Sequence, residues 1–229
     1  MTDENRLLPL FPLPLVQFPG AITPLHIFEP RYRTLLRDVL DGDKTFGIIY
    51  QRGPQPPDAL TGKPVLVGCS VEVVAHHELE DGRSNIVCVG VQRFRVLNYV
   101  DGAPYDRAEV ELFDDAPVVG DVSEEINRIS RLLWRVITIG RRLGEVSGVA
   151  DEEPPEFPSD PQLFSTTLSS YLEIEMEEKQ ELLELVSSQE RMRRAELLLE
   201  SLATDYERRV FAQEVARKNG HTGSSLGEL

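Results

Sequence analysis

Apolar and polar residues alternate along the first half of the chain with the period of two that is typical of β-strands. Residues 65–73 and 86–96 follow this alternation on either side of Asp81-Gly82, a dipeptide that favours a tight hairpin turn. Further extended segments are expected at residues 7–11, 16–20, 21–28, 45–51, 94–100 and 107–113. The first half is therefore predicted to consist largely of short strands.

Proline interrupts the earliest of these segments, at Pro9, Pro12, Pro14 and Pro24. Because proline donates no ladder hydrogen bond, a strand that contains it is expected at the edge of a sheet or beside a bulge. The segment 7–28 is therefore predicted to form an exposed edge.

Helical periodicity appears early at residues 32–40 and then dominates the second half. The early helix is expected to end at Gly42, which would supply a left-handed cap. The later helices are expected at residues 123–143, 161–171, 176–186 and 188–218. The predicted fold class is α+β: a partly closed barrel or sandwich of mostly antiparallel strands with one early helix, followed by a helical bundle.

This change of pattern divides the chain into two predicted subdomains. Residues 1–116 form the β-rich subdomain and residues 117–219 the helical one. Residues 148–161 are acidic and rich in proline, which is typical of a solvated loop. Residues 220–229 are polar and rich in glycine, so they are expected to be a flexible tail.

Composition narrows the possible partners. The net charge of −15 opposes a general affinity for nucleic acid, since phosphate binding depends on clustered Lys and Arg. The chain start has no basic region followed by an apolar one, and no run is long enough for a membrane span, so a cytoplasmic location without membrane partners is expected. Cys69 and Cys88 lie in apolar segments and are expected to be buried free thiols.

The motifs of common catalytic and metal sites fail at particular positions. Gly62-Lys63 is followed by proline and lacks the upstream glycine of a phosphate-binding loop. His77-Glu78 lacks the second histidine of H-E-x-x-H and falls on a predicted strand. No metal ion or other cofactor is therefore expected.

One catalytic pattern, G-x-S-x-G, matches literally at residues 223–227, around Ser225. A nucleophile elbow requires a buried strand before it, a helix after it, and a later aspartate and histidine. Only four residues follow Ser225, in a polar tail. A chance match is the better interpretation, and no catalytic residue is expected.

The stretch PLHIFEPRYR gathers several ionisable groups, which fit the junction between a strand and a helix. Pro30 suits the first helical position, where its missing donor costs nothing, and Glu29 can act at the helix start. Arg31 and Arg33 are expected to point to water or to pair with nearby acids. His26 is more consistent with a packed or hydrogen-bonded group than with a catalyst.

Several stretches, taken together, resemble the amino-terminal domain of the Lon protease family. In the first half they are LPLFPL at 8–13, FPG at 18–20, PLHIFEPRYR at 24–33, VGCSVEV at 67–73 and GVQRFRV at 90–96. In the second half they are KQELLE at 179–184, ERM at 190–192 and LLL at 197–199. The resemblance is close over residues 6–113 and looser over residues 160–208.

The resemblance implies a PUA-like pseudo-barrel followed by a helical bundle, in a domain that contacts unfolded substrates. Full-length Lon proteins continue into an ATPase module and a serine–lysine protease domain, and neither is found in this sequence. The chain is therefore expected to be a free-standing domain and not an enzyme. A role in protein quality control, together with a protease or chaperone, would follow.

The leading hypothesis is a module that binds unfolded or extended polypeptides at the proline-broken edge. The candidate contact residues are Phe18, Pro24, His26, Phe28, Glu29, Arg31, Tyr32, Arg93 and Phe94. The opposing interpretation is that the aromatic residues fill the barrel, since large apolar side chains are usually inside.

Three other functions stay open at this stage. A structural adaptor would dock through the acidic helices, and exposed apolar groups on the 188–218 helix would favour it. RNA binding is known among PUA-like folds, and the arginines at 191–194 and 208–209 could serve it, although the net charge opposes it. A hydrolase would have to use Ser225. The oligomeric state cannot be predicted.

Overall fold

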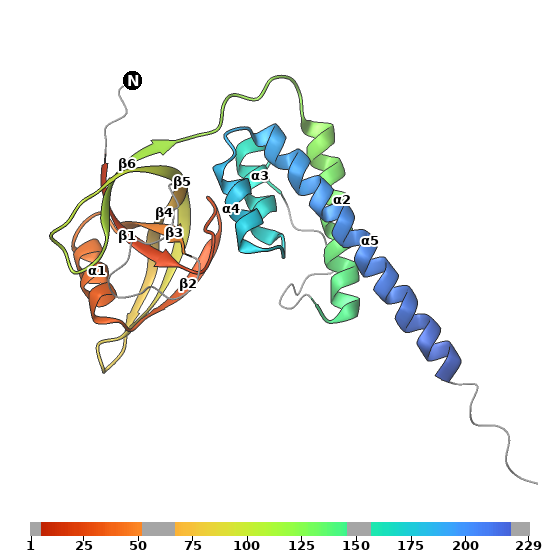
Figure 1. Ribbon diagram of the computed structural model, residues 1–229, viewed down its shortest axis with the longest axis horizontal. Helices are drawn as coiled ribbons and strands as arrows, with labels where there is room; N and C mark the ends of the chain where they lie inside the picture. The colour runs from red at the N-terminus through yellow and green to blue at the C-terminus, as the bar shows by residue number, and fades with distance from the viewer. Residues whose placement is uncertain (1–5, 52–66, 146–156, 221–229) are drawn as a thin grey trace, which may run out of the picture.

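A computed structural model describes residues 6–51, 67–145 and 157–220 of the chain (Figure 1). The strands are β1 (Arg6–Leu13), β2 (Ile22–Ile27), β3 (Thr45–Tyr50), β4 (Val67–Glu78), β5 (Ser84–Tyr99) and β6 (Arg107–Phe113). The helices are α1 (Pro30–Asp41), α2 (Ser123–Leu143), α3 (Pro161–Tyr171), α4 (Met176–Glu184) and α5 (Ser188–Gly220). The acidic loop up to residue 156 and the tail from residue 221 lie outside the described residues.

Five of the six described strands close into a barrel, and β2 extends the sheet beside β5. The strand order is β2-β5-β4-β3-β1-β6, and β5 also pairs with β6. β5 makes this closure possible because it is 16 residues long and pairs with β2 through its first half and with β6 through its second half. A register shift between Val96 and Asn98 bends it at the β6 end. The predicted α+β barrel of mostly antiparallel strands is confirmed.

The two prolines of β1, Pro9 and Pro12, are accommodated in a different way from Pro24, the one proline of β2. β1 lies between β3 and β6, so the prediction of an edge is wrong for this strand. Arg6–Pro9 pairs with β6 and Leu10–Leu13 pairs with β3, so each half of β1 has one neighbouring strand. Where a strand has a neighbour on one side only, proline is tolerated because its missing backbone N–H can fall on the unpaired side. β2, which contains Pro24, pairs with β5 alone among the described strands and is an edge as predicted.

The predicted strand at 16–20 is wrong, since the chain forms a loop there. Gln17 holds the loop: its amide nitrogen donates to the carbonyl of Ala21 at 2.8 Å, and its amide oxygen accepts from the Thr23 hydroxyl at 2.6 Å. Side-chain hydrogen bonds thus replace ladder bonds at this point. The loop directs Phe18 into the interior.

Helix α1 begins at Pro30 as predicted, but it ends by another device than a glycine cap. Gly42 has φ of −105°, so the predicted left-handed cap is wrong. The left-handed conformation falls two residues later, at Lys44 with φ of 60°, whose N–H donates to the Val39 carbonyl at 3.0 Å. The predicted hairpin turn is confirmed at Gly82, with φ of 75°.

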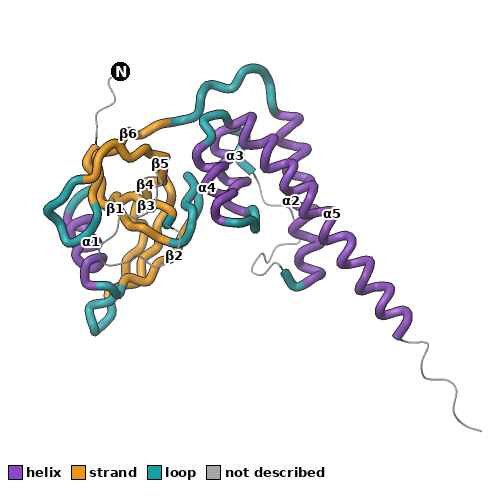
Figure 2. Tube along the Cα trace, viewed as in Figure 1, coloured by secondary structure: helices purple, strands orange, loops and turns teal. Residues whose placement is uncertain are grey.

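In the helical half, α2 and α5 run side by side in the same direction (Figure 2). Arg128 of α2 donates two hydrogen bonds, of 2.7 and 2.9 Å, to Glu196 of α5. A second ion pair joins Arg135 of α2 to Glu207 of α5, nearer the C-terminal ends of both helices. α5 then projects beyond the rest of the described molecule, as Figure 1 shows.

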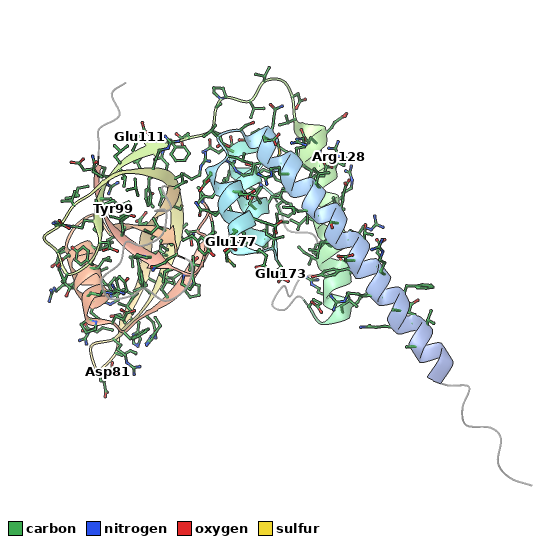
Figure 3. The ribbon with its side chains drawn as sticks, in the orientation of Figure 1. Asp81, Tyr99, Glu111, Arg128, Glu173 and Glu177 are labelled. Atoms are coloured by element: carbon green, nitrogen blue, oxygen red, sulfur yellow. The ribbon has the colours of Figure 1, made fainter. Side chains whose placement is uncertain are left out.

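The interior of the helical half also takes in side chains from the barrel. Its core is built from α2, α3, α4 and α5, and Phe18 and Val67 of the barrel belong to the same apolar cluster. Between the two halves, the Tyr50 hydroxyl contacts a carboxylate oxygen of Glu177 at 3.1 Å, and Figure 3 shows Glu177 on the side of α4 that faces the barrel. The barrel and the helices are therefore packed against each other.

Candidate functional site

The nine residues predicted to bind peptide divide into two groups by their exposure. Phe18, Tyr32, Arg93 and Phe94 are buried. The remaining five are exposed or partly exposed and lie on β2 or just after it: Pro24, His26, Phe28, Glu29 and Arg31. The structure thus leaves one continuous segment, residues 24–31, as the part of the predicted site that a ligand can reach.

The buried aromatic residues form the scaffold. Phe94 lies inside the barrel against Gly47 and Gly68, where an added Cβ would come within 2.7 and 2.6 Å of its ring. Tyr32 of α1 packs on Phe11 of β1, with 4.1 Å between the ring centres. Burial raises the pKa of Tyr32 to about 12. These rings hold the helix and strands that position the exposed segment.

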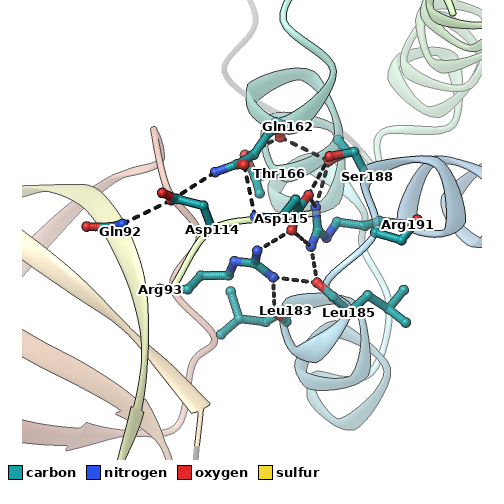
Figure 4. Close-up of polar contacts among 12 residues, drawn as sticks. Gln92, Arg93, Asp114, Asp115, Gln162, Thr166, Leu183, Leu185, Ser188 and Arg191 are labelled. Atoms are coloured by element: carbon teal, nitrogen blue, oxygen red, sulfur yellow. Dashed lines mark hydrogen bonds and ion pairs between the residues drawn. The ribbon is translucent and has the colours of Figure 1, made fainter. Parts of the chain in front are cut away.

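Arg93 belongs to a buried cluster of ion pairs that joins the barrel to the helices (Figure 4). Asp115, in the segment between β6 and α2, accepts hydrogen bonds from Arg93 of β5 and from Arg191 of α5. The two contacts of Arg191 measure 2.7 and 2.9 Å. The three side chains are at most 2% exposed, and the hydroxyl of Ser188 also donates to Asp115.

Two guanidinium groups share this single carboxylate, and main-chain carbonyls compensate the second positive charge. The Leu182 carbonyl accepts from Arg191 at 2.9 Å, and the Leu183 carbonyl accepts from Arg93 at 3.0 Å. The Leu185 carbonyl accepts from both arginines. Carbonyls at the C-terminal end of a helix carry partial negative charge, so the end of α4 suits this role. α4 accordingly ends two residues before its predicted end.

Electrostatics within the cluster favour the charged state of its carboxylate. Burial alone would raise the pKa of Asp115, but hydrogen bonds and charge from Arg191, with Ser188 and Arg93, hold that pKa below its usual value. Burial and the nearby Arg191 lower the pKa of Arg93. Sequence reasoning missed this cluster because Asp115 and Arg191 carry no local pattern that separates them from surface charges.

The exposed segment presents an open strand edge with apolar side chains. The side chains of Ile22 on β2 and Phe28 just after it are 69% and 58% exposed. Pro24 lies opposite Val87 of β5, and Ile22 lies opposite Val89. In an edge strand, alternate residues turn their N–H and C=O groups away from the neighbouring strand. An extended chain can therefore reach apolar side chains together with backbone groups that no described strand pairs.

A hollow of about 410 Å³ lies on the sheet beside this edge. Its apolar surface includes Pro24, Ala75 and Val87, and three histidines and Asn85 supply its polar groups. His26 Nδ1 lies 2.7 Å from Asn85 Oδ1, and the ring of His26 is stacked on Phe28 with 6.0 Å between centres. The hollow and the edge form one candidate surface, which we call the β2 surface.

At the end of the β2 surface the chain turns into α1. Glu29 precedes the helix, and its side chain makes no capping hydrogen bond. It pairs instead with Arg31, whose Nε lies 3.1 Å from the Glu29 carboxylate and whose guanidinium lies 4.5 Å from the centre of the Tyr32 ring. The predicted pairing of Arg31 with a nearby acid is confirmed.

Within residues 6–51, 67–145 and 157–220, no three histidine, cysteine or acidic side chains are grouped so that they could hold a metal ion. None of the helices in these ranges combines the length and apolar character of a membrane span. Cys69 and Cys88 are buried free thiols, as predicted.

Comparison with known proteins agrees with this architecture. The family model of the ATP-dependent protease La (LON) substrate-binding domain matches residues 7–201. Lon protease of Anaeromyxobacter dehalogenans is 30% identical over 203 residues, which cover 87% of this chain and 23% of that protein. Lon protease 2 of Myxococcus xanthus is 28% identical, over 87% of this chain and 24% of that protein. The chain thus spans about a quarter of the length of these relatives.

Two solved structures share the fold. A Lon N-terminal domain protein from Xanthomonas campestris has a TM-score of 0.60 and 23% identity, over 82% of this chain and 96% of that chain. The N-terminal domain of Mycobacterium avium complex Lon protease has a TM-score of 0.60 and 18% identity, over 87% and 99%. The chain therefore has an α+β fold, in which a PUA-like pseudo-barrel is followed by a helical bundle. The chain belongs to the Lon substrate-binding domain family.

Proposed function

We propose that the chain is a non-catalytic module that captures extended or unfolded polypeptide segments in protein quality control. Membership of a substrate-binding domain family supports a binding role. The observation that carries the proposal is the β2 edge, which presents Ile22 and Phe28 to solvent on a strand that pairs with β5 alone among the described strands. A client would add a strand to this edge and place alternate side chains on the β2 surface.

Within this proposal the nine predicted residues have different tasks. Pro24, His26 and Phe28 contact the client, and the Glu29–Arg31 pair borders the end of the bound segment. The buried members, Phe18, Tyr32, Arg93 and Phe94, act by holding the edge in place.

The wider setting is also proposed. The module works in the cytoplasm with a protease or a chaperone, and without a cofactor, a nucleic acid or a membrane as partner. Its net charge of −15 supports the absence of nucleic acid. Residues 1–116 form the capturing subdomain and residues 117–219 the helical subdomain.

The binding of a fluorescent peptide with alternating apolar residues, followed by anisotropy, tests the proposal. The double variant Ile22→Ser and Phe28→Ser should weaken binding roughly tenfold or more, about 1.4 kcal/mol, because it removes two exposed apolar contacts. Phe211→Ser on α5 is the matched control, since Phe211 is 68% exposed and lies on the projecting helix. Both variants should keep the wild-type circular dichroism spectrum.

A structural adaptor that docks through its helices is the second candidate. The exposed apolar side chains on α5, Leu197, Phe211 and Val215, favour it. Under this alternative Phe211→Ser would reduce binding to a partner protein, and the β2 double variant would leave it unchanged. The same pair of variants thus separates the two functions.

A further inference from the structure

Histidine is concentrated in the hollow of the β2 surface. The chain has four histidines, and three of them, His26, His76 and His77, line this hollow. Among the described residues that line it there is no Asp, Glu, Lys or Arg, although the chain contains 39 acidic and 24 basic residues. Protonation of the imidazoles therefore changes the charge of the lining itself.

The histidines occupy fixed places across three strands. His26 of β2 lies opposite Asn85 of β5, and Asn85 lies opposite His77 of β4, so the three form one row across the sheet. His26 is held by its 2.7 Å contact with Asn85. His76 is held by Ser84, with 3.1 Å between Nε2 and Oγ. His26 and His77 can therefore receive one segment that crosses the sheet edge, whereas His76 lies opposite the buried Ile86 and so faces the other side of the sheet, toward α1.

Charged groups from neighbouring elements approach only one of the three histidines within the described lining. His76 also lines an adjoining pocket with Arg33, Arg37 and Asp41 of α1 and with Glu78 of β4. The two arginines and the two acids give this pocket no formal surplus of charge. A positive charge that appears on the imidazoles is therefore not cancelled by the lining of either pocket.

We propose that this hollow is a subsite for extended segments in which carboxylate side chains alternate with apolar ones. The apolar residues rest on Pro24, Ala75 and Val87, and the carboxylates meet the imidazoles of His26 and His77. Because histidine takes up its proton between pH 8 and pH 5, the preference for acidic segments rises as the pH falls. The proposal rests on the proposed function and names its client class.

Charge complementarity selects this occupant over other anions. An anionic surface such as a membrane or a nucleic acid would meet the repulsion of a protein with a net charge of −15. A short extended segment meets only the hollow, and its backbone can also pair with the β2 edge. Such a client is held by the apolar lining of the hollow, by its imidazoles and by the adjoining β2 edge.

Two peptides test the proposal, identical in their alternating apolar residues and carrying Asp or Asn at the positions between. Their dissociation constants are measured at about pH 8 and about pH 5.5, at constant salt and with EDTA to exclude metal bridging. The ratio of the two constants should move in favour of the Asp peptide by roughly threefold to tenfold on acidification, as expected for one or two exposed ion pairs.

Variants assign the effect to the hollow. The triple variant His26→Gln, His76→Gln and His77→Gln should lose the pH-dependent part of the ratio and still bind the Asn peptide. His221→Gln, a change in the fourth histidine, should keep it. A ratio that does not move in the wild type, or that still moves in the triple variant, overturns the proposal.

The peptide measurements also separate failure of the proposed function from failure of the preference for acidic segments. If neither peptide binds at any pH, the proposed function itself fails; if both bind with a constant ratio, only the preference for acidic segments fails. Should the triple variant unfold, the imidazole NMR signals of the wild type replace it. Those of His26 and His77 should shift on addition of the Asp peptide at about pH 5.5, and unchanged signals contradict the proposal.

Discussion

Replacing Asp115 by asparagine probes the junction between the barrel and the helices. The substitution keeps the size of the side chain but removes the only carboxylate that Arg93 and Arg191 share. Two buried guanidinium groups are then left with carbonyl and hydroxyl partners alone. Breaking a buried ion pair by removing one partner costs about 3–5 kcal/mol, so the free energy of unfolding should fall by that amount.

Denaturant unfolding measures this loss. Trp134, the only tryptophan, lies on α2, so its fluorescence reports the helical half, and circular dichroism reports the whole chain. Arg95→Gln is the control, because its pair with Glu111 is partly exposed, and the loss should stay below about 1 kcal/mol. A loss below about 1 kcal/mol for Asp115→Asn as well would refute the structural role of the cluster.

The same carboxylate also predicts a pH dependence with a definite sign. The pKa of Asp115 is lower in the folded protein than its usual value, so the unfolded chain binds more protons in acid. Its contribution to stability is therefore complete above about pH 4 and is lost as the pH falls through the folded pKa. Asp115→Asn should flatten this part of the stability profile, and an unchanged slope would contradict the assignment.

Three other predictions concern the scaffold. Phe94→Ala should lower the free energy of unfolding by about 3–5 kcal/mol in thermal or chemical melts, because the ring fills the barrel, and a loss under about 1 kcal/mol would contradict this. Gly68→Ala should destabilise by about 1–3 kcal/mol, since the new Cβ would lie 2.5 Å from the Ile48 carbonyl oxygen; a neutral result would show that the strands can separate. Burial raises the pKa of Cys69 and of Cys88 to about 12, so both thiols should react slowly with a disulfide reagent at about pH 8 until denaturant is added, and rapid reaction of the folded protein would exclude their burial.

Local sequence patterns predicted much of the fold because helix starts and tight turns depend on residues that are close together in the sequence. Pro30 marks the start of α1 since its missing donor is harmless there, and the turn at Gly82 follows from the need for positive φ. The partner switch within β1 could not be predicted, since a strand's neighbours depend on residues far along the chain. The loop at Gln17 was not predicted, because the side-chain hydrogen bonds that hold it produce no periodic pattern in the sequence.

The candidate site was predictable only in part, for a related reason. Pro24 correctly indicated an edge strand. Phe18 and Phe28 lie outside the strands, where no alternation indicates that Phe18 is buried and Phe28 exposed; for Phe94 on β5, the alternating pattern does not tell which face of the strand is buried. The link from Arg93 to Asp115 spans 22 positions in the sequence. Only the folded chain brings them together.

Hydrogen–deuterium exchange with and without a saturating extended peptide tests the central claim most directly. Strand addition at β2 predicts slower amide exchange in Ile22–Ile27, with little change in β1 or in the projecting part of α5. Unchanged exchange in β2 under saturating peptide, or protection confined to α5, would contradict capture at the β2 edge.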